Sequence, residues 1–319
     1  MRNHTFFPAQ RALLVLFLLF TFSSSSGQDA YTSVVAKTGD GIFSVLRKSG
    51  IHPIKYYEEF LRLNSEHIKN GSQLIVGKEY KLPNAPDSFK MTGIRIDANE
   101  GEEGPIFNEE QLSLMNLKDS TLQNTVYYFV HSGVVDSKKQ FDDVANRLAK
   151  DLMLKGARVY ILENSKMEKT ALDSLPKSVK MEMYGEYSSI INKKYLRHNG
   201  SYQRVILLED TIGKHQNMVL SISHNGHSKE GRQFASVLSE VLRKNAVVPS
   251  KVKNETNPFK DKESMYLANN LIPPVIILNF TDASHSTVPG FNLKSGKKSL
   301  VGLLNDGILE DYTQLNLEN

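Results

Sequence analysis

The stretch Val126–Leu162 constrains the fold of this chain more than any other part of the sequence. An apolar, β-branched and aromatic run, Val126–Val130, predicts a strand, and Val159–Leu162 predicts a second one. Between them, apolar residues recur at helical spacing and predict an amphipathic helix that ends before Gly156. These apolar residues are Phe141, Val144, Ala145, Leu148, Ala149 and Leu152. A strand, a helix and a strand in so short a stretch form a βαβ unit with parallel strands and a right-handed crossover.

The sequence after this unit continues to alternate between strands and helices. Further strands are predicted at Val205–Leu208, Met218–Ile222 and Pro274–Asn279. Helices are predicted at Ser228–Lys244 and Leu300–Leu309, whereas Met265–Leu271 is a short segment without an assigned type. Residues 164–194 are expected to be a long polar loop with a helix at its end. Residues 126–319 are therefore expected to form an α/β domain with a mostly parallel sheet. Ligands bind outside the carboxyl ends of parallel strands, so a site is expected in the loop 131–139.

The N-terminus has the pattern of a secretory signal. Arg2 and Arg11 precede the apolar run Ala12–Phe22, and small residues follow it. This run is short for a membrane span, so cleavage after Gly27 is expected, and an uncleaved anchor is the alternative. Without the segment 1–27 the net charge falls from +4 to +2, too balanced to indicate a nucleic-acid partner. The chain contains no cysteine, which favours a bacterial envelope protein that depends on its core rather than on disulfides.

Residues 31–84 predict a small unit with the order βααβ. Its motifs are a Gly39-Asp40 turn before a short helix, Leu61-x-Leu63-Asn64, and the closing run LIVGKEYKLP at 74–83. On these motifs the unit resembles the LysM domain, with Gly41 where threonine is usual and Tyr80 in place of an aliphatic residue. The resemblance implies that residues 28–84 bind N-acetylglucosamine-containing glycans, mainly peptidoglycan or chitin.

The resemblance also implies where the glycan binds. The groove of LysM domains lies between the loop after the first strand and the loop before the second. Carried over to this chain, the groove residues are Gly39, Asp40, Gly41, Ile42, Leu74, Ile75, Val76 and Gly77. Glycines let backbone amides approach acetamido groups, and isoleucine and valine pack on their methyls. The alternative interpretation is that Ile42 and Ile75 are only core residues.

Residues 85–125, which include an acidic, glycine-containing stretch, are expected to be a linker.

The large domain resembles zinc-dependent N-acetylmuramoyl-L-alanine amidases, in particular a branch with a LysM domain before the catalytic one. The match covers 104–311 and consists mainly of scaffold motifs in the right order. They are Gly104-Pro105-Ile106-Phe107, the strand Val126–Val130, the helix end Leu148–Gly156, Met218–Leu220, Gly231-x-x-Phe234-Ala235 and Pro273–Ile277.

The resemblance implies a zinc held by His, Glu and His, with a second Glu as general acid and base. A zinc with an open position lowers the pKa of its bound water, and a carboxylate takes the proton. In this chain the four matching positions hold other residues: Gly133 or Val134, then Lys139, Leu208 and Asn279. Lysine is a cation and leucine has no lone pair, so no catalytic residue and no metal ligand is predicted.

Two other sites are conceivable. A relocated metal site would use His131, Asp210, His224 and His227, and a Ser-His-Asp arrangement would use Ser223, His224 and Asp282. Nothing in the sequence places three of the first group around one point, and the second lacks a nucleophile elbow. We expect these residues to be solvated loop positions.

The sequence thus predicts an exported protein of the periplasm or cell envelope. Its function would be to bind peptidoglycan, or another N-acetylglucosamine glycan, through the LysM-like unit. The amidase-like domain would be catalytically degenerate and without a cofactor. The alternative is an active zinc amidase with a non-standard metal site. Another envelope protein is a second candidate partner, and nucleic acid is not expected.

Overall fold

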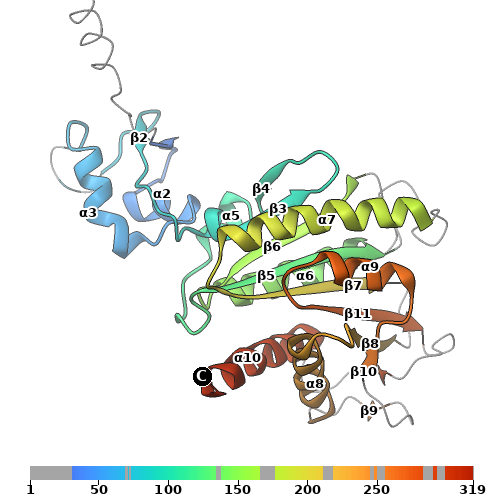
Figure 1. Cartoon of the computed structure of the whole chain (residues 1–319). Coiled ribbons are helices and arrows are strands. Elements are labelled where there is room, and N and C mark those ends of the chain that lie inside the picture. Colours follow the sequence, from blue (N-terminus) through green and yellow to red (C-terminus); the bar gives the residue numbers. More distant parts are fainter. Residues whose placement is uncertain are drawn as a thin grey trace, which may run out of the picture.

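The computed structural model describes residues 31–68, 71, 73–133, 138–165, 177–210, 218–244, 248–249, 256–282, 290–292 and 299–318 (Figure 1). The predicted signal segment 1–27 and the candidate position Val134 lie outside these ranges. No helix within the described ranges is long and apolar enough to cross a membrane.

The small N-terminal unit has the predicted βααβ order. Its elements are β1 (Ser33–Val35), α2 (Ile42–Lys48), α3 (Pro53–Leu63) and β2 (Glu79–Lys81). The two strands pair antiparallel, and the fully buried Tyr80 on β2 packs with Phe60 of α3. The buried Asn64 ties the end of α3 to β2, because its amide donates to the carbonyls of Phe60 and Lys81 and accepts from Lys81 N. These hydrogen bonds stabilise the small unit, since each buried backbone group needs a hydrogen-bond partner.

The large domain is built on one sheet of ten strands. They are β3 (Gly93–Asp97), β4 (Glu103–Pro105), β5 (Thr125–Gly133), β6 (Arg158–Glu163), β7 (Tyr202–Asp210), β8 (Met218–His224), β9 (Val248–Pro249), β10 (Thr256–Pro258), β11 (Val275–Asp282) and β12 (Phe291–Asn292). The strand order is β4-β3-β6-β5-β7-β11-β8-β12-β9, and β10 pairs with β8. The central run β3-β6-β5-β7-β11 is parallel throughout, which confirms the predicted α/β fold with a mostly parallel sheet.

Helices cover both faces of this sheet (Figure 1). The helices that follow the small unit are α4 (Phe89–Thr92), α5 (Glu109–Ser113), α6 (Lys138–Met153), α7 (Lys177–Arg197), α8 (Lys229–Lys244), α9 (Lys262–Asn270) and α10 (Leu300–Glu318). One apolar cluster joins α6, α8 and α10 to one face, and a second joins α7 and α9 to the other. The result is a three-layer arrangement in which the central strands are apolar on both sides, as buried parallel strands require.

Two expectations differ from the structure. Residues 85–125, predicted to be a linker, contain β3 and β4, and β3 pairs with β6 at the edge of the sheet. The region 164–194, expected to be mostly loop, contains the long helix α7. The parallel order ends at β11, since β8 runs antiparallel to it, which agrees with the expected mostly parallel sheet. Each difference concerns an edge or a covering helix, where the apolar pattern is weak.

The small unit contacts the large domain through the end of α2. Gly50 has a φ of +72° and its carbonyl accepts a hydrogen bond from Phe89 N at 2.8 Å. A Cβ at Gly50 would lie 3.0 Å from Lys90 N and 3.4 Å from Leu112 Cδ2, so only glycine fits this close approach. Lys37 of the small unit also lies 3.7 Å from Glu109 at the start of α5. This junction lies near the amino ends of β5 and β6, since Gln123 and Gly156 share a cavity of about 290 Å³ with Gly50.

The stability of the fold is expected to depend on pH through His198, which directly follows α7. The Tyr160 hydroxyl and His198 Nε2 are 2.8 Å apart, and burial, with Arg158, Arg197 and Lys194 nearby, lowers the pKa of His198 to about 4. A histidine whose pKa is lowered on folding contributes stability above its unfolded pKa of about 6.5, and this stability is lost as the pH falls toward the folded value.

Between about pH 7 and pH 4.5, we expect the free energy of unfolding of the wild type to fall more than that of His198→Gln. The difference should be at most about 1–2 kcal/mol, because the ring is partly solvated. Urea unfolding at the two pH values measures this difference. The same substitution at exposed His227 is the control. Parallel losses in the wild type and His198→Gln would contradict the assignment.

Candidate functional site

The carboxyl ends of the central strands carry a row of polar residues on one face of the sheet. The register pairs Ser132 of β5 with Glu209 of β7, and Glu209 with Asn279 of β11. It also pairs Asn279 with Ser221 of β8. Residues paired across neighbouring strands point to the same face. These four residues, Ser132, Glu209, Asn279 and Ser221, are named the polar row below.

Hydrogen bonds join the polar row to itself and to the helix that covers it. Asn279 Nδ2 donates to Glu209 Oε2 at 3.0 Å, and the Ser132 hydroxyl lies 3.1 Å from the hydroxyl of Tyr184 on α7. Burial, together with the nearby Glu209 carboxylate, raises the pKa of Tyr184, so the phenol stays protonated. The Oδ1 atom of Asn279 is buried and has no hydrogen-bond partner among the described residues. The row is therefore a buried to half-buried, neutral-to-anionic group with both donors and acceptors.

The other face of the same strand ends is apolar. His131 stacks on Phe141 of α6 with ring centroids 4.5 Å apart, and Leu208 is 3% exposed within the apolar cluster beneath α6, α8 and α10. Because successive strand residues alternate in direction, Leu208 and Asn279 lie on opposite faces of the sheet. The resemblance to the amidases places Leu208 at the position of their second histidine ligand. The residue of β7 that pairs with Asn279, on the same face of the sheet, is Glu209.

The polar row is not apparent as a unit in the sequence. The signal available was the change from apolar to polar residues at the end of each strand, as in Leu208-Glu209-Asp210 and Leu278-Asn279. Which of these residues share a face follows from the register between strands, which no single segment contains.

The described residues do not offer the donor set of a zinc site. Lys139 lies exposed in the first turn of α6, Leu208 has no lone pair, and Asn279 is an amide. No group of three His, Cys, Asp or Glu side chains able to hold a metal occurs in the part of the chain that the structure describes. Tetrahedral zinc needs three or four such ligands, so these side chains do not fit the metal.

The relocated metal site is not assembled either. His131 lies on β5 and His224 on β8, with β7 and β11 between them. Three strand spacings of ~4.8 Å separate the two chains by roughly 14 Å, too far for one metal ion. His224 Nδ1 lies 3.2 Å from the carbonyl of Asn225, and His227 is exposed. Ser223 and His224 are consecutive in a strand and point to opposite faces, so the Ser-His-Asp arrangement is not formed.

The two loops of the predicted glycan groove lie side by side. An isolated antiparallel bridge joins Gly41 to Gln73, and Gly77 N donates to the carbonyl of Ala36 at 2.8 Å. Ile75 and Val76 are 58% and 59% exposed, whereas Ile42 is 2% exposed and belongs to the core of the unit. An apolar pair exposed next to backbone bridges is a surface that a ligand can cover.

Asp40, another predicted groove residue, is engaged within the unit. Its carboxylate accepts hydrogen bonds from Lys37 N, Ser44 and Lys48. Burial alone would raise the pKa of Asp40, but these hydrogen bonds outweigh it and hold the pKa below its usual value. Gly39 and Gly77 have φ of +85° and +81°, and a Cβ at either position would meet no atom within 4 Å. These glycines are therefore required by backbone conformation in the turns and leave open space beside them.

Comparisons with known proteins give distant similarities. No family model and no curated protein matches the chain. Among solved structures, the N-acetylmuramyl-L-alanine amidase of Mycobacterium smegmatis is similar over 62% of this chain and 99% of its own, with 11% identity and a TM-score of 0.40. The CwlD amidase of Clostridioides difficile, solved with the GerS lipoprotein, covers 60% of this chain and 99% of its own, at 11% identity and a TM-score of 0.37. A metallo-carboxypeptidase from Burkholderia cenocepacia is similar over 60% of this chain and 58% of its own, with 12% identity and a TM-score of 0.36. Similarities this distant assign no role to any residue of this chain.

Proposed function

We propose that this is an exported protein of the cell envelope that binds peptidoglycan, or another N-acetylglucosamine glycan, through its LysM-like unit. Its large domain is an amidase-like α/β domain without hydrolase activity, which serves for binding or scaffolding. The observation that carries the proposal is the exposed pair Ile75–Val76 beside the Gly41–Gln73 bridge, at the place where the sequence resemblance puts a glycan.

The chemistry of this surface suits an N-acetylated sugar. Acetamido methyl groups pack on aliphatic side chains, and the glycines of both loops let backbone amides and carbonyls approach the ligand. Such a shallow surface buries little area, so affinity for one sugar is modest. A polymer with repeated units compensates through many equivalent positions along one strand.

The degenerate state of the large domain is supported by its side chains. The polar row offers Glu209 as a carboxylate, but its neighbours are amide and hydroxyl groups joined by hydrogen bonds. Leu208 and Lys139 supply no ligand to a metal, and without one no water is activated by this route. An active zinc amidase with a different ligand set remains the alternative. About one zinc per chain, removed by a chelator together with muropeptide turnover, would establish it.

Glycan binding is tested with the double variant Ile75→Glu, Val76→Glu. Loss of two apolar contacts and the new charges are expected to weaken binding to insoluble peptidoglycan at least about tenfold. Cosedimentation of the full-length protein over a range of glycan concentrations measures the change. Ile54→Glu, which alters a 75% exposed isoleucine of the same unit on α3, is the matched control. Equal sedimentation of the double variant and the control would reject the groove. Asp40 is avoided because its contacts hold the unit together.

A further inference from the structure

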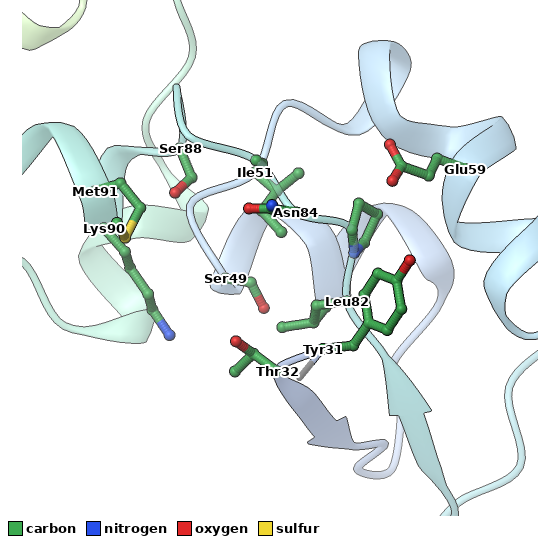
Figure 2. A pocket seen from close by; sticks show the side chains of 12 residues that line it. Tyr31, Thr32, Ser49, Ile51, Glu59, Leu82, Asn84, Ser88, Lys90 and Met91 are labelled. Carbon is green, nitrogen blue, oxygen red and sulfur yellow. The ribbon is translucent and has the colours of Figure 1, made fainter. Parts of the chain in front are cut away.

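The small unit has a cavity of about 490 Å³ that is separate from the predicted groove. It lies between the start of β1, the end of α2 and the segment that leads to β3 (Figure 2). None of the eight predicted groove residues lines it. Its volume falls in the range of small-ligand sites. The polar residues that line it are Tyr31, Thr32, Ser49, Glu59, Asn84, Ser88 and Lys90.

Two largely buried serine residues line this cavity. Ser49 is 6% exposed and Ser88 is 5% exposed. Ser88 is the N-cap residue of α4, but its side chain makes no capping hydrogen bond. Neither hydroxyl has a hydrogen-bond partner within the described part of the chain. Neither hydroxyl oxygen is among the fully buried unpartnered atoms of the described residues, so both are open to the cavity and can donate to, or accept from, a polar ligand there.

Lys90 gives one end of the cavity a positive charge. Its ammonium forms no ion pair within the described residues, although Glu59 lies in the same lining. Figure 2 shows the side chains of Lys90, Ser49 and Thr32 ending in one part of the cavity, and Glu59 lying at the other side. One ammonium with hydroxyl donors is a set that recognises a carboxylate.

The remaining lining is apolar and suits the body of a small organic ligand. Ile51 and Leu82 are buried beneath the cavity, and the Tyr31 ring, 39% exposed, lies at its rim. An apolar floor with a few polar groups that fix orientation is the usual composition of a ligand site.

We propose that this cavity binds a small ligand through its carboxylate. The carboxylate lies at Lys90 and accepts hydrogen bonds from the hydroxyls of Ser49 and Thr32. Ser88 and Asn84 contact the polar groups of the ligand body. Two sources have this chemistry: an acidic amino sugar and the free carboxyl end of a short peptide. The inference depends on the cavity alone and not on the glycan groove.

Two matched pairs of probes test the proposal by calorimetry on the full-length protein. N-acetylmuramic acid is compared with N-acetylglucosamine, which lacks the lactyl carboxylate, and alanyl-alanine is compared with its C-terminal amide. We expect the acid of at least one pair to bind at least about tenfold more tightly than its neutral counterpart, as a charge-assisted hydrogen bond predicts. The pair that shows the preference identifies the source. Higher salt should reduce the preference.

Variants then assign the preference to the cavity. Lys90→Ala and Ser49→Ala are expected to reduce it, Lys90→Arg to retain most of it, and exposed Lys118→Ala to leave it unchanged. The double variant Ile75→Glu, Val76→Glu should also leave it unchanged, which separates this site from the groove. Acids that bind no better than their neutral counterparts, or a preference that survives Lys90→Ala, would overturn the proposal. Retention in Lys90→Arg together with loss in Lys90→Ala assigns the preference to the positive charge at this position.

Discussion

Replacing Asp311 with alanine is expected to lower the free energy of unfolding of the large domain by about 3–5 kcal/mol. Asp311 lies on α10 and is fully buried, and the Arg204 side chain on β7 is 5% exposed. Arg204 Nε donates to Asp311 Oδ2 at 3.0 Å, and the Tyr202 hydroxyl donates to the same oxygen. The variant leaves a buried guanidinium without its counter-charge, which costs far more than the loss of a surface ion pair.

Urea unfolding at neutral pH measures this effect. The control is Glu240→Ala, which removes a surface pair in which Lys244 Nζ lies 2.7 Å from Glu240 Oε1 on α8. We expect the control to leave the free energy of unfolding nearly unchanged, because exposed i,i+4 pairs contribute little. If both variants lowered the free energy of unfolding by the same small amount, the Arg204–Asp311 pair would not contribute much to the packing of α10 on the sheet.

A double substitution separates the cost of breaking the pair from its net contribution. Arg204 Nη2 and Asp311 Oδ1 are buried without hydrogen-bond partners in the described part of the chain, and burial raises the pKa of Asp311 despite the nearby guanidinium. Both observations indicate that desolvation offsets much of the attraction. We therefore expect Arg204→Met with Asp311→Leu to recover most of the stability that Asp311→Ala loses.

The central layers of the fold could be predicted because their sequence patterns are strong. The βαβ unit is confirmed as β5, α6 and β6, since a continuous apolar run and a helical stripe have few alternative structures. The same holds for β11, where Val275–Leu278 is apolar on both faces and buried on both.

The edge of the sheet and one covering helix could not be predicted in the same way. The edge strand pair β3 and β4 contains Arg95, which reaches Asp142 and Glu163 at 3.0 Å, so its ion pairs form only in the fold. The helix α7 buries polar Ser188 and charged Lys194 along with its apolar residues, and it exposes apolar residues such as Leu196, so the contrast between its two faces is weak. Lys194 is stabilised there by Glu103 at 2.7 Å, a residue distant in sequence. Tertiary contacts of this kind decide structure where local pattern is weak.

The candidate site illustrates the same limit at single-residue resolution. The sequence predicts that a strand ends at Leu208, whereas β7 continues to Asp210. The choice between Leu208 and Glu209 depends on which face of the sheet each residue occupies. A shift of one residue in a strand exchanges the two faces. Only pairing with Ser132 on one side and Asn279 on the other assigns Glu209 to the polar row.

This assignment predicts how a metal site could be restored. Elemental analysis of the purified wild type is expected to find no stoichiometric zinc, and muropeptides should remain uncleaved. Two variant sets are compared, each with Val134→His, Lys139→Glu and Asn279→Glu. The first set adds Leu208→His, which places an imidazole in the apolar core on the face away from residue 279. The second set adds Glu209→His, on the face of residue 279.

We expect the first set to be destabilised by about 2–4 kcal/mol, because a buried polar ring replaces a core leucine, and to bind no zinc. The second set brings an imidazole and a carboxylate together at one strand end and should take up zinc more tightly than the wild type, although catalysis also needs supporting hydrogen bonds around the ligands. Zinc bound by the first set and not by the second would show that Leu208 is the correct position and that the register argument is wrong. Wild-type protein that contains about one zinc per chain and cleaves muropeptides would show that the large domain is an active amidase.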